Sequence, residues 1–274
     1  MIKSISLVTG ASSGLGRVLA ELLCEKGHRV YVTARRRHLL ERFKNECKDL
    51  GGEIVIISGD LADFKFREKL VSTILKKEGK IDYLFNNAGY GRSTEFEKED
   101  FKEMENMFEV NMVAYAHLAR LVLPGMIKKN KGRIINVGSV VAFTPLSYFT
   151  IYNSTKAAIY SFNRSLRYEL KGRNVTTTVV LPTRMKTGFA ERAYDCYKEK
   201  GRDVCIKEWN KIARSPYIVA KNVIRNMDKG KGVIAPTSLA KILYFARHFE
   251  FLVDFLNKNI MGPKELERLR KLAR

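Results

Sequence analysis

Apolar residues along the chain fall into two alternating patterns, short β-branched runs and longer stretches with helical spacing. The short runs predict strands at 5–9, 29–33, 54–58, 81–86, 133–138, 175–181 and 232–235. The longer stretches, such as 15–23, place Leu and Val about 3.6 residues apart, which is the helical period. Because the strand runs are mostly apolar rather than alternating, they predict strands covered on both faces. Strands alternating with helices indicate βαβ units, so we predict an α/β fold with a doubly wound parallel sheet.

Two regions break this rhythm. Residues 188–215 mix polar and aromatic side chains without a clear strand, and the segment beginning at 238 is dense in Leu, Phe and Ile. The chain has no Pro/Gly/Ser-rich linker and no internal repeat. We therefore predict one domain over 1–236, with a lid at about 188–215, and a helical extension over 237–274 that packs on the domain.

Composition narrows the class of protein. A length of 274 residues with 45% apolar content fits a single α/β domain with a sizeable core. The four cysteines, at 24, 47, 196 and 205, are scattered and accompany only four His, which argues against a metal cluster or a disulfide framework. The apolar run 5–8 leads straight into a glycine turn, so no signal peptide is expected. Reduced thiols and a cytoplasmic location are predicted.

The net charge of +21 points to nucleic acid, an anionic membrane surface or acidic ligands as alternatives. The 50 Lys and Arg residues are spread along the chain among 29 acidic ones, with few long like-charge blocks. This distribution favours a basic solvated surface, and no specific nucleic-acid partner is predicted.

A glycine-rich turn, TGASSGLG at 9–16, joins the first predicted strand to a helix. Three glycines here allow the backbone to approach a pyrophosphate, and the start of the helix supplies free N–H groups. The spacing is G-x-x-x-G-x-G rather than G-x-G-x-x-G. A turn that only packs a strand on a helix is the alternative, but the strand–turn–helix context favours a dinucleotide site.

The end of the second strand indicates which dinucleotide. An NAD site places an Asp or Glu about 20 residues past the glycines to bind the ribose 2′-hydroxyl. Here Arg35 and Arg36 follow the strand and no acid stands at its end. Guanidinium groups pair with a 2′-phosphate, so NADP(H) is favoured over NAD(H). A solvated basic start to the next helix is the alternative, and it explains Arg37 better than its two predecessors.

Tyr152 and Lys156 stand four residues apart, a spacing that places both on one face of a helix. A free Tyr titrates near ~10 and is a poor acid–base catalyst at neutral pH. A nearby ammonium favours the phenolate and lowers the tyrosine pKa. The pair alone is weak evidence, since both residue types are abundant in the chain.

The order of these motifs resembles the short-chain dehydrogenase/reductase family over about residues 1–190. The matching series, in chain order, is TGASSGLG at 9–16, Asp60 and Leu61, NNAG at 86–89, Asn111, Ser139, Tyr152 and Lys156. The resemblance implies a Rossmann-like domain that interconverts a carbonyl and an alcohol by hydride transfer with NADP(H). Chance supplies any one of these motifs but not the ordered series.

The resemblance also implies roles. Tyr152 would give its proton to the substrate oxygen, Lys156 would lower the Tyr152 pKa and hold the nicotinamide ribose, and Ser139 would hydrogen-bond the substrate oxygen. Asn111 would hold a water that relays protons to Lys156, and Asp60 would contact the adenine. The predicted catalytic residues are Asn111, Ser139, Tyr152 and Lys156, and the substrate-binding ones Ser139 and Tyr152. The predicted nucleotide-binding residues are Gly10, Ser12, Ser13, Gly14, Leu15, Gly16, Arg35, Arg36, Asp60, Leu61, Asn87, Ala88, Gly89, Tyr152, Lys156, Pro182, Met185 and Thr187.

One departure from the family pattern concerns the loop after the sixth strand. The family has Pro-Gly-x-Val-x-Thr, and this chain has PTRMKT at 182–187. Thr183 in place of Gly disfavours positive φ, which puts the loop shape in doubt but not the reaction.

The substrate is not named by any motif. Phe189, Tyr194, Tyr197 and Trp209 in the lid would form an apolar wall for a lipophilic carbonyl compound, with ordinary helix packing as the alternative. The segment 239–256 carries Lys241, Arg247, Glu250 and Asp254, so it is not expected to span a membrane. Packing on the core, covering an apolar substrate and lying on anionic lipid remain open for it.

Two further alternatives concern assembly and activity. The long predicted helices 101–129 and 151–171 correspond to those that pair subunits in the family, which implies a homodimer or homotetramer. A non-catalytic NADP-binding sensor, or a protein that docks on a membrane or partner with the same fold, is the rival to an enzyme. The full set of Asn111, Ser139, Tyr152 and Lys156 favours the enzyme.

Overall fold

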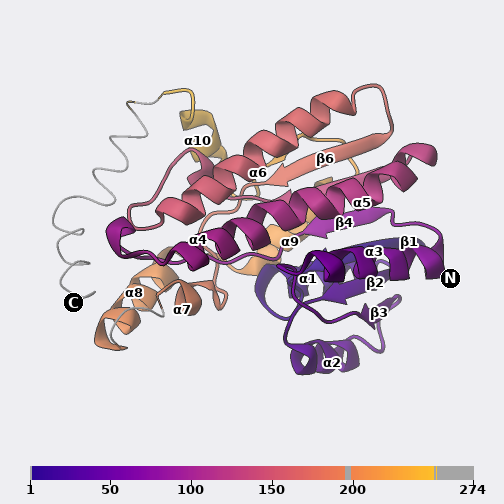
Figure 1. Cartoon of the computed structure of the whole chain (residues 1–274), viewed down its shortest axis with the longest axis horizontal. Helices are drawn as coiled ribbons and strands as arrows, with labels where there is room; N and C mark the ends of the chain where they lie inside the picture. The colour runs from indigo at the N-terminus through magenta and orange to yellow at the C-terminus, as the bar shows by residue number, and fades with distance from the viewer. Residues whose placement is uncertain (1, 195–198, 250, 252–274) are drawn as a thin grey trace.

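Seven parallel strands form a single sheet in the order β3-β2-β1-β4-β5-β6-β7 (Figure 1). The structure is a computed structural model that describes residues 2–194, 199–249 and 251. The strands are β1 Ser4–Thr9, β2 His28–Thr33, β3 Glu53–Ile56, β4 Tyr83–Asn86, β5 Gly132–Val137, β6 Val175–Val180 and β7 Val233–Ile234. All seven predicted strands are thereby confirmed, with ends that differ by one or two residues.

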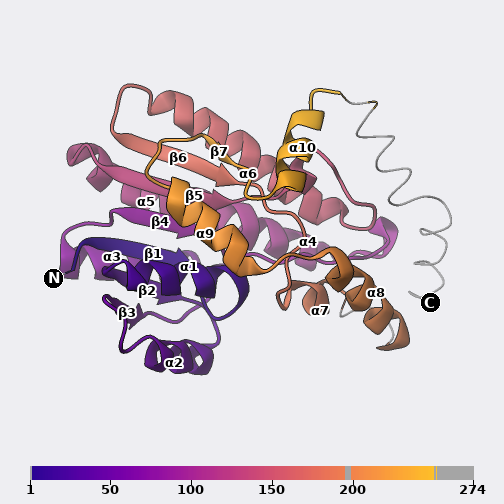
Figure 2. The same ribbon diagram turned by 180° about the vertical axis from the view of Figure 1, so that it is seen from behind.

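Helices cover both faces of the sheet (Figures 1 and 2). Their bounds are α1 Gly14–Glu25, α2 Arg37–Glu46, α3 Phe64–Glu78, α4 Phe101–Phe108, α5 Ala114–Lys128, α6 Thr150–Glu169, α7 Phe189–Ala193, α8 Glu199–Ile212, α9 Pro216–Asn226 and α10 Ser238–Ala246. α1, α2 and α9 pack in one apolar core, and α3, α5 and α6 pack in the other. The predicted doubly wound α/β class is confirmed.

Neighbouring strand residues enter opposite cores. Leu7 and Leu84 pack under α3 and α5, whereas the next residues, Val8 and Phe85, pack under α1 and α9. Successive side chains of a strand point to opposite faces, and here both faces are buried. The apolar runs without alternation in the sequence are the direct consequence.

The sheet has its switch point beside β1, which pairs with β2 on one side and β4 on the other. Chain segments leaving β1 and β4 therefore diverge and open a crevice at the carboxyl ends of the strands. The backbones touch at its floor: a Cβ on Gly10 would lie 2.7 Å from the Ala88 Cα. Only glycine fits there.

The predicted helix 101–129 is one continuous helical run interrupted by a π-turn. α4 passes through the π-turn Glu109–Val113 into α5, and Asn111 lies at the centre of the turn. By length and composition, the run Phe101–Lys128 could span a bilayer. Its buried residues, among them Met107, Leu118 and Val122, pack inside the domain, so it is a core helix. The second predicted helix, 151–171, corresponds to α6.

The predicted lid consists of α7 and α8, which lie beside each other at the carboxyl end of the sheet (Figure 1). α10 packs on the domain through Ala240, Leu243 and Tyr244, which contact Phe143 and Tyr160. Tyr197 of the predicted wall, and Glu250, Asp254 and the rest of 252–274, lie outside the described residues. The division of the chain at 236 stays a prediction.

Candidate active site

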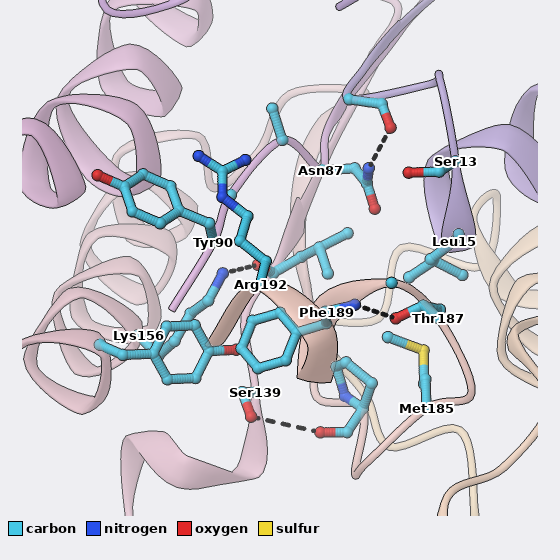
Figure 3. A pocket seen from close by; sticks show the side chains of 18 of the residues that line it. Ser13, Leu15, Asn87, Tyr90, Ser139, Lys156, Met185, Thr187, Phe189 and Arg192 are labelled. Carbon is cyan, nitrogen blue, oxygen red and sulfur yellow. Dashed lines mark hydrogen bonds between the residues drawn. The ribbon is translucent and has the colours of Figure 1, made fainter. Parts of the chain in front are cut away.

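A cavity of about 660 Å³ lies at the carboxyl ends of the strands, where the predicted site residues gather (Figure 3). Both predicted substrate-binding residues and nearly all predicted nucleotide-binding residues line it. Gly16 and Asn111 are the two predicted site residues that stand outside the lining. The members confirmed as lining are Gly10, Ser12, Ser13, Gly14, Leu15, Arg35, Arg36, Asp60, Leu61, Asn87, Ala88, Gly89, Ser139, Tyr152, Lys156, Pro182, Met185 and Thr187.

The glycine turn has the backbone that a phosphate cradle requires. Gly10 and Gly14 have φ of 68° and 58°, in the left-handed region that glycine enters without strain. The first turn of α1 carries no acidic residue, and the Ser13 side chain does not cap it. Its N–H groups and positive dipole end therefore fit the pyrophosphate of a dinucleotide.

Gly16 packs against the segments behind the cavity, and its part in nucleotide binding stays a prediction. A Cβ at this position would lie 2.4 Å from the Asn87 Nδ2 and 2.6 Å from the Gly10 carbonyl oxygen. The missing side chain allows Asn87 to donate a hydrogen bond of 2.9 Å to the Thr9 carbonyl. Gly16 thus shapes the cavity from behind, because its lack of a side chain brings α1 and the β4 loop together.

Thr9, which the sequence analysis did not place in the site, ties β1 to the loop after β4. Its buried hydroxyl accepts hydrogen bonds from the N–H groups of Asn87 and Ala88, at 2.9 and 3.0 Å. Thr9 is the first residue of the TGASSGLG motif. Its hydroxyl at the end of a strand is the sequence feature that could have identified it as a site residue.

Arg35 and Arg36 stand at the end of β2, facing the cavity, as predicted. One Arg36 nitrogen donates hydrogen bonds of 3.0 Å to the hydroxyls of both Ser12 and Ser13. Arg35 lies 3.7 Å from the Asp60 carboxylate, an exposed ion pair across the same part of the cavity. Two guanidinium groups beside the glycine turn form a basic subsite.

Asp60 and Leu61 are held by the loop between β3 and α3. The Asp60 carboxylate accepts a hydrogen bond of 3.0 Å from the Ala62 N–H, and the Leu61 carbonyl accepts one of 2.8 Å from Arg67. Arg67 is only 2% exposed and also pairs with Glu109 in the π-turn. Sequence reasoning missed Arg67, because a lone basic residue in a helix gives no sign of burial.

Tyr152 and Lys156 lie on α6 at the base of the cavity. The Lys156 ammonium donates a hydrogen bond of 3.0 Å to the Val137 carbonyl and lies 5.6 Å from the centre of the Tyr152 ring. Burial lowers the pKa of Lys156 to about 7, because the enclosed site does not hydrate its charged form.

The effect on Tyr152 is the reverse of the one expected from the sequence. Burial raises the pKa of Tyr152 above its ordinary value, and a hydrogen bond with Ser139 opposes that rise. The expected lowering by Lys156 is wrong, because burial outweighs the other effects on the phenol and also lowers the pKa of the lysine to about 7, which weakens its charge. At neutral pH, Tyr152 therefore holds its proton.

Ser139 comes close to Tyr152 although thirteen residues separate them. The short helical turn Val140–Ala142 after β5 reverses the chain, and the Ser139 hydroxyl caps it by accepting a hydrogen bond of 3.3 Å from the Val141 N–H. The Thr144 hydroxyl donates a bond of 2.8 Å to the Val140 carbonyl in the returning loop. This loop delivers the Ser139 oxygen to the phenol.

Asn111 contacts Tyr90 and Thr155 rather than the cavity. Its amide accepts a hydrogen bond of 3.0 Å from the Tyr90 N–H and donates bonds of 2.8 Å to the Tyr90 carbonyl and 3.1 Å to the Thr155 hydroxyl. A Cβ on Gly89 would lie 2.9 Å from the Asn111 amide oxygen. Asn111 thus joins the β4 loop to α6, and its part in a proton relay stays a prediction.

The loop after β6 accommodates Thr183 without strain. Among the described non-glycine residues, positive φ occurs only at Asn130 and Tyr148, so Thr183 has ordinary backbone geometry. Thr187 still reaches the glycine turn: a Cβ on Gly14 would lie 3.1 Å from its methyl group. The doubt about the loop shape is removed.

The far end of the cavity is apolar. Of the aromatic residues predicted for the lid wall, Phe189 and Trp209 line the cavity, whereas Tyr194 packs beneath them against Phe149. Phe189 lies 5.3 Å from Tyr152 and 5.4 Å from Trp209, ring centre to ring centre. Both alternatives for the lid therefore hold, since these rings pack with each other and also face the cavity. Leu239 and Leu243 also line the cavity, which agrees with the alternative that the segment 239–256 covers an apolar substrate. Sequence reasoning missed the apolar lining residues Val141, Leu146, Phe149 and Ile212.

These features define a dinucleotide-type α/β fold with a Ser–Tyr–Lys site at the switch point. Comparison with known proteins agrees: the family model for short chain dehydrogenases matches residues 4–197. The chain belongs to the short-chain dehydrogenase/reductase family and is an oxidoreductase that acts on CH–OH groups.

Individual relatives extend the comparison. The chain is 30% identical over 250 residues to "11-beta-hydroxysteroid dehydrogenase-like 3" of Arabidopsis thaliana, covering 90% of this chain and 77% of the relative. It is 34% identical over 179 residues to "NADP-dependent 3-hydroxy acid dehydrogenase YdfG" of Escherichia coli (strain K12), covering 65% and 71%. The solved structure of a short-chain dehydrogenase from Sphingobium yanoikuyae in complex with NADPH is 27% identical, with a TM-score of 0.78 over 95% and 96% of the two chains.

Proposed function

We propose that this protein is an NADP(H)-dependent oxidoreductase that interconverts a lipophilic ketone or aldehyde with its alcohol. The observation that carries the proposal is the joining of two half-sites in one cavity. Gly10, Gly14 and Arg36 line one part, and Ser139 and Tyr152 line another. A nucleotide bound along the first part would present its reactive ring to the second.

The nucleotide half fits NADP(H) better than NAD(H). The start of α1 and the glycine turn would hold the pyrophosphate, and Asp60 and Leu61 would border the adenine. Arg35 and Arg36 would hold a 2′-phosphate through charge-assisted hydrogen bonds. The relatives from Escherichia coli and Sphingobium, whose names include NADP or NADPH, support this choice.

The chemical half supplies a proton and a polarising hydrogen bond. The nicotinamide, when bound, carries the hydride. The raised pKa of Tyr152 keeps its phenol protonated at neutral pH, which suits donation to a carbonyl oxygen. The Ser139 hydroxyl, hydrogen-bonded with Tyr152, would orient that oxygen and stabilise the charge that forms on it.

Lys156 completes the site. Its pKa of about 7 lets it hold or release a proton at the pH of the reaction, and its ammonium lies 5.6 Å from the centre of the Tyr152 ring. Lys156 would also hold the nicotinamide ribose, and Asn111 would support proton relay to it from behind.

The apolar part of the cavity supports a lipophilic substrate. Phe189 and Trp209 form one side and Leu239 and Leu243 another. The hydroxysteroid dehydrogenase-like relative is named for a substrate of this class, and the 3-hydroxy acid dehydrogenase for a smaller one. The apolar lining favours the first.

The test is NADPH oxidation, followed with carbonyl compounds that run from small aldehydes to long-chain and steroid-like ketones. We expect the lipophilic ketones to give the highest kcat/KM. Tyr152→Phe should reduce kcat by at least about a thousandfold while NADPH still binds, because only the proton donor is lost. Substantial turnover by that variant would refute the assignment of the acid. NADPH binding without turnover of any carbonyl by the unaltered protein would favour the sensor.

We also infer that the protein forms a homo-oligomer through the outer faces of α5 and α6. A groove between these helices is lined mainly by apolar residues, among them Leu123, Pro124, Ile127 and Phe162. An exposed apolar face of this kind is typical of a subunit interface. Light scattering after size-exclusion chromatography would measure the mass, and Leu123→Glu should reduce it to that of one chain.

A further inference from the structure

One face of α10 is apolar and exposed. Leu239, Ile242, Phe245 and Phe249 are 50%, 62%, 67% and 40% exposed. At about 100° per residue, Leu239, Ile242 and Phe245 lie within roughly a third of the helix circumference, and the centre of the Phe249 ring lies 5.8 Å from that of the Phe245 ring. Phe249, just past the helix end, is held by a hydrogen bond of 2.9 Å from its N–H to the Ala246 carbonyl. We call these four residues the α10 crest.

The opposite face of α10 is already occupied. Ala240, Leu243 and Tyr244 pack on Phe143 and Tyr160 of the domain. The crest therefore cannot be turned inward by rotation of the helix, because rotation would expose the residues that now pack. Isolated exposed apolar side chains are common, but four on one face indicate a binding surface.

The charged residues on and beside α10 are basic. Lys241 is exposed on α10, and the Arg247 guanidinium lies 3.7 Å from the centre of the Tyr244 ring. Arg164 of α6 is exposed beside the same group of rings, 5.9 Å from the centre of the Tyr160 ring. Residues 238–249 contain no Asp or Glu. The exposed apolar crest thus belongs to a segment whose charged side chains are all cationic.

The crest adjoins the substrate end of the cavity. Leu239 belongs both to the crest and to the cavity lining, and Leu243 on the same helix also lines the cavity. Ile212, at the end of α8, lines it too and is 57% exposed. Both views show α10 at the same end of the molecule as α7 and α8 (Figures 1 and 2).

We propose that the α10 crest docks on an anionic lipid bilayer surface. Apolar side chains that enter the headgroup boundary, with cations around them that meet anionic lipids, are the physical requirements of an interfacial helix. α10 has nine residues, far fewer than the ~20 needed to cross a bilayer, so it lies on the surface. A second copy of the chain fits less well, because its crest would bring the same cations against these.

Docking in this orientation would place the apolar end of the cavity beside the lipid. A lipophilic substrate could then pass from the bilayer to the site with little exposure to water. This consequence rests on the proposed function, whereas the docking itself does not.

The experiment is co-sedimentation of the full chain with phosphatidylcholine vesicles, with and without phosphatidylserine. We expect binding that needs phosphatidylserine and weakens with salt, since exposed charges are screened. The double variant Ile242→Glu/Phe245→Glu should bind at least about tenfold more weakly, since two exposed apolar side chains that would enter the bilayer are lost. The matched control is Phe64→Glu, a phenylalanine 52% exposed at the start of α3, which should bind as the unaltered chain does.

Circular dichroism and NADPH binding establish that the variants are folded, and neither measurement requires turnover. Equal vesicle binding by the double variant and the unaltered chain would overturn the proposal. Binding to neutral and anionic vesicles alike would also overturn it. A third outcome would overturn it too: the unaltered chain binds no vesicles and forms a dimer, and the double variant is a monomer. The crest would then be the contact surface for a second copy of the chain.

Discussion

The indole N–H of Trp209 donates a hydrogen bond of 3.1 Å to the Met185 carbonyl, which joins the lid to the loop after β6. Beside this bond, Met185 and Arg214 form a parallel bridge in which the Lys186 N–H donates to the Arg214 carbonyl at 2.8 Å. Trp209 also stacks on Phe189, which packs on Tyr152. The loop after β6, the lid and the phenol are therefore in one continuous set of contacts.

This arrangement predicts separable effects of two Trp209 variants. Trp209→Phe keeps a ring against Phe189 but loses the N–H donor, and we expect the KM for the carbonyl substrate to rise several-fold with little change in kcat. Trp209→Ala also removes the ring contact, so kcat should fall as well. Steady-state kinetics would measure both. Identical kinetics of the two variants would show that the hydrogen bond, and not the ring, carries the whole effect.

A second prediction concerns Arg67, which links the loop between β3 and α3 to the π-turn that holds Asn111. Arg67→Met removes the partner of Glu109 and the donor to the Leu61 carbonyl. We expect a loss of roughly 3 kcal/mol in the free energy of unfolding, together with weaker NADPH binding. Denaturant unfolding and fluorescence titration would measure these.

The matched control for Arg67 is Arg42→Met. Arg42 pairs with Glu46 at 3.2 Å on the exposed face of α2. Exposed pairs of this kind contribute at most about 1 kcal/mol. Equal losses in the two variants would contradict a linking function for Arg67.

The third prediction follows from the lowered pKa of Lys156. Its pKa is 10.5 when solvated and about 7 in the folded protein, so between these values the unfolded chain binds the additional proton. The contribution of Lys156 to the free energy of unfolding therefore rises with pH over that window. At pH 7 and below, burial of this group destabilises the folded protein most. In Lys156→Met, this increase of the free energy of unfolding with pH should be absent.

Urea unfolding at pH 7 and pH 9, at one protein concentration and without nucleotide, tests this. The stability of Lys156→Met relative to the unaltered protein should fall by roughly 2 kcal/mol between the two pH values, since each pKa unit corresponds to about 1.4 kcal/mol. A difference that does not change with pH would mean that Lys156 stays fully charged in the folded protein.

The fourth prediction tests the basic subsite. Replacing Arg35 and Arg36 together by Ala should weaken NADPH binding by at least about tenfold, since hydrogen bonds between charged groups are lost. NADH, which has no 2′-phosphate, should lose about twofold or less. Calorimetric titration would give both Kd values. The control is Arg37→Ala, which breaks only an exposed pair with Glu41. Equal losses for the two nucleotides would contradict the assignment.

Much of the fold could be read from local sequence patterns. The strand runs, the glycine turn and the spacing of Tyr152 and Lys156 are short-range features. Strands that are buried on both faces are apolar runs, and such runs can be identified without knowing which strands pair. The predicted cavity residues were found for the same reason, since parallel strands bring their carboxyl ends to one edge. Gly16 and Asn111 were predicted as site residues from the family resemblance, and the structure places both outside the cavity lining.

What only the tertiary structure decided lies in contacts between distant segments. The burial of Arg67, the bond from Trp209 to Met185 and the exposure of the α10 crest depend on which elements pack together, and the sequence pattern does not encode this locally. The pKa directions depend on it most. The sequence by itself placed a phenol and an ammonium on one helix face, but only the packed domain decides how far each is removed from water. That removal keeps Tyr152 protonated and lowers the pKa of Lys156 to about 7.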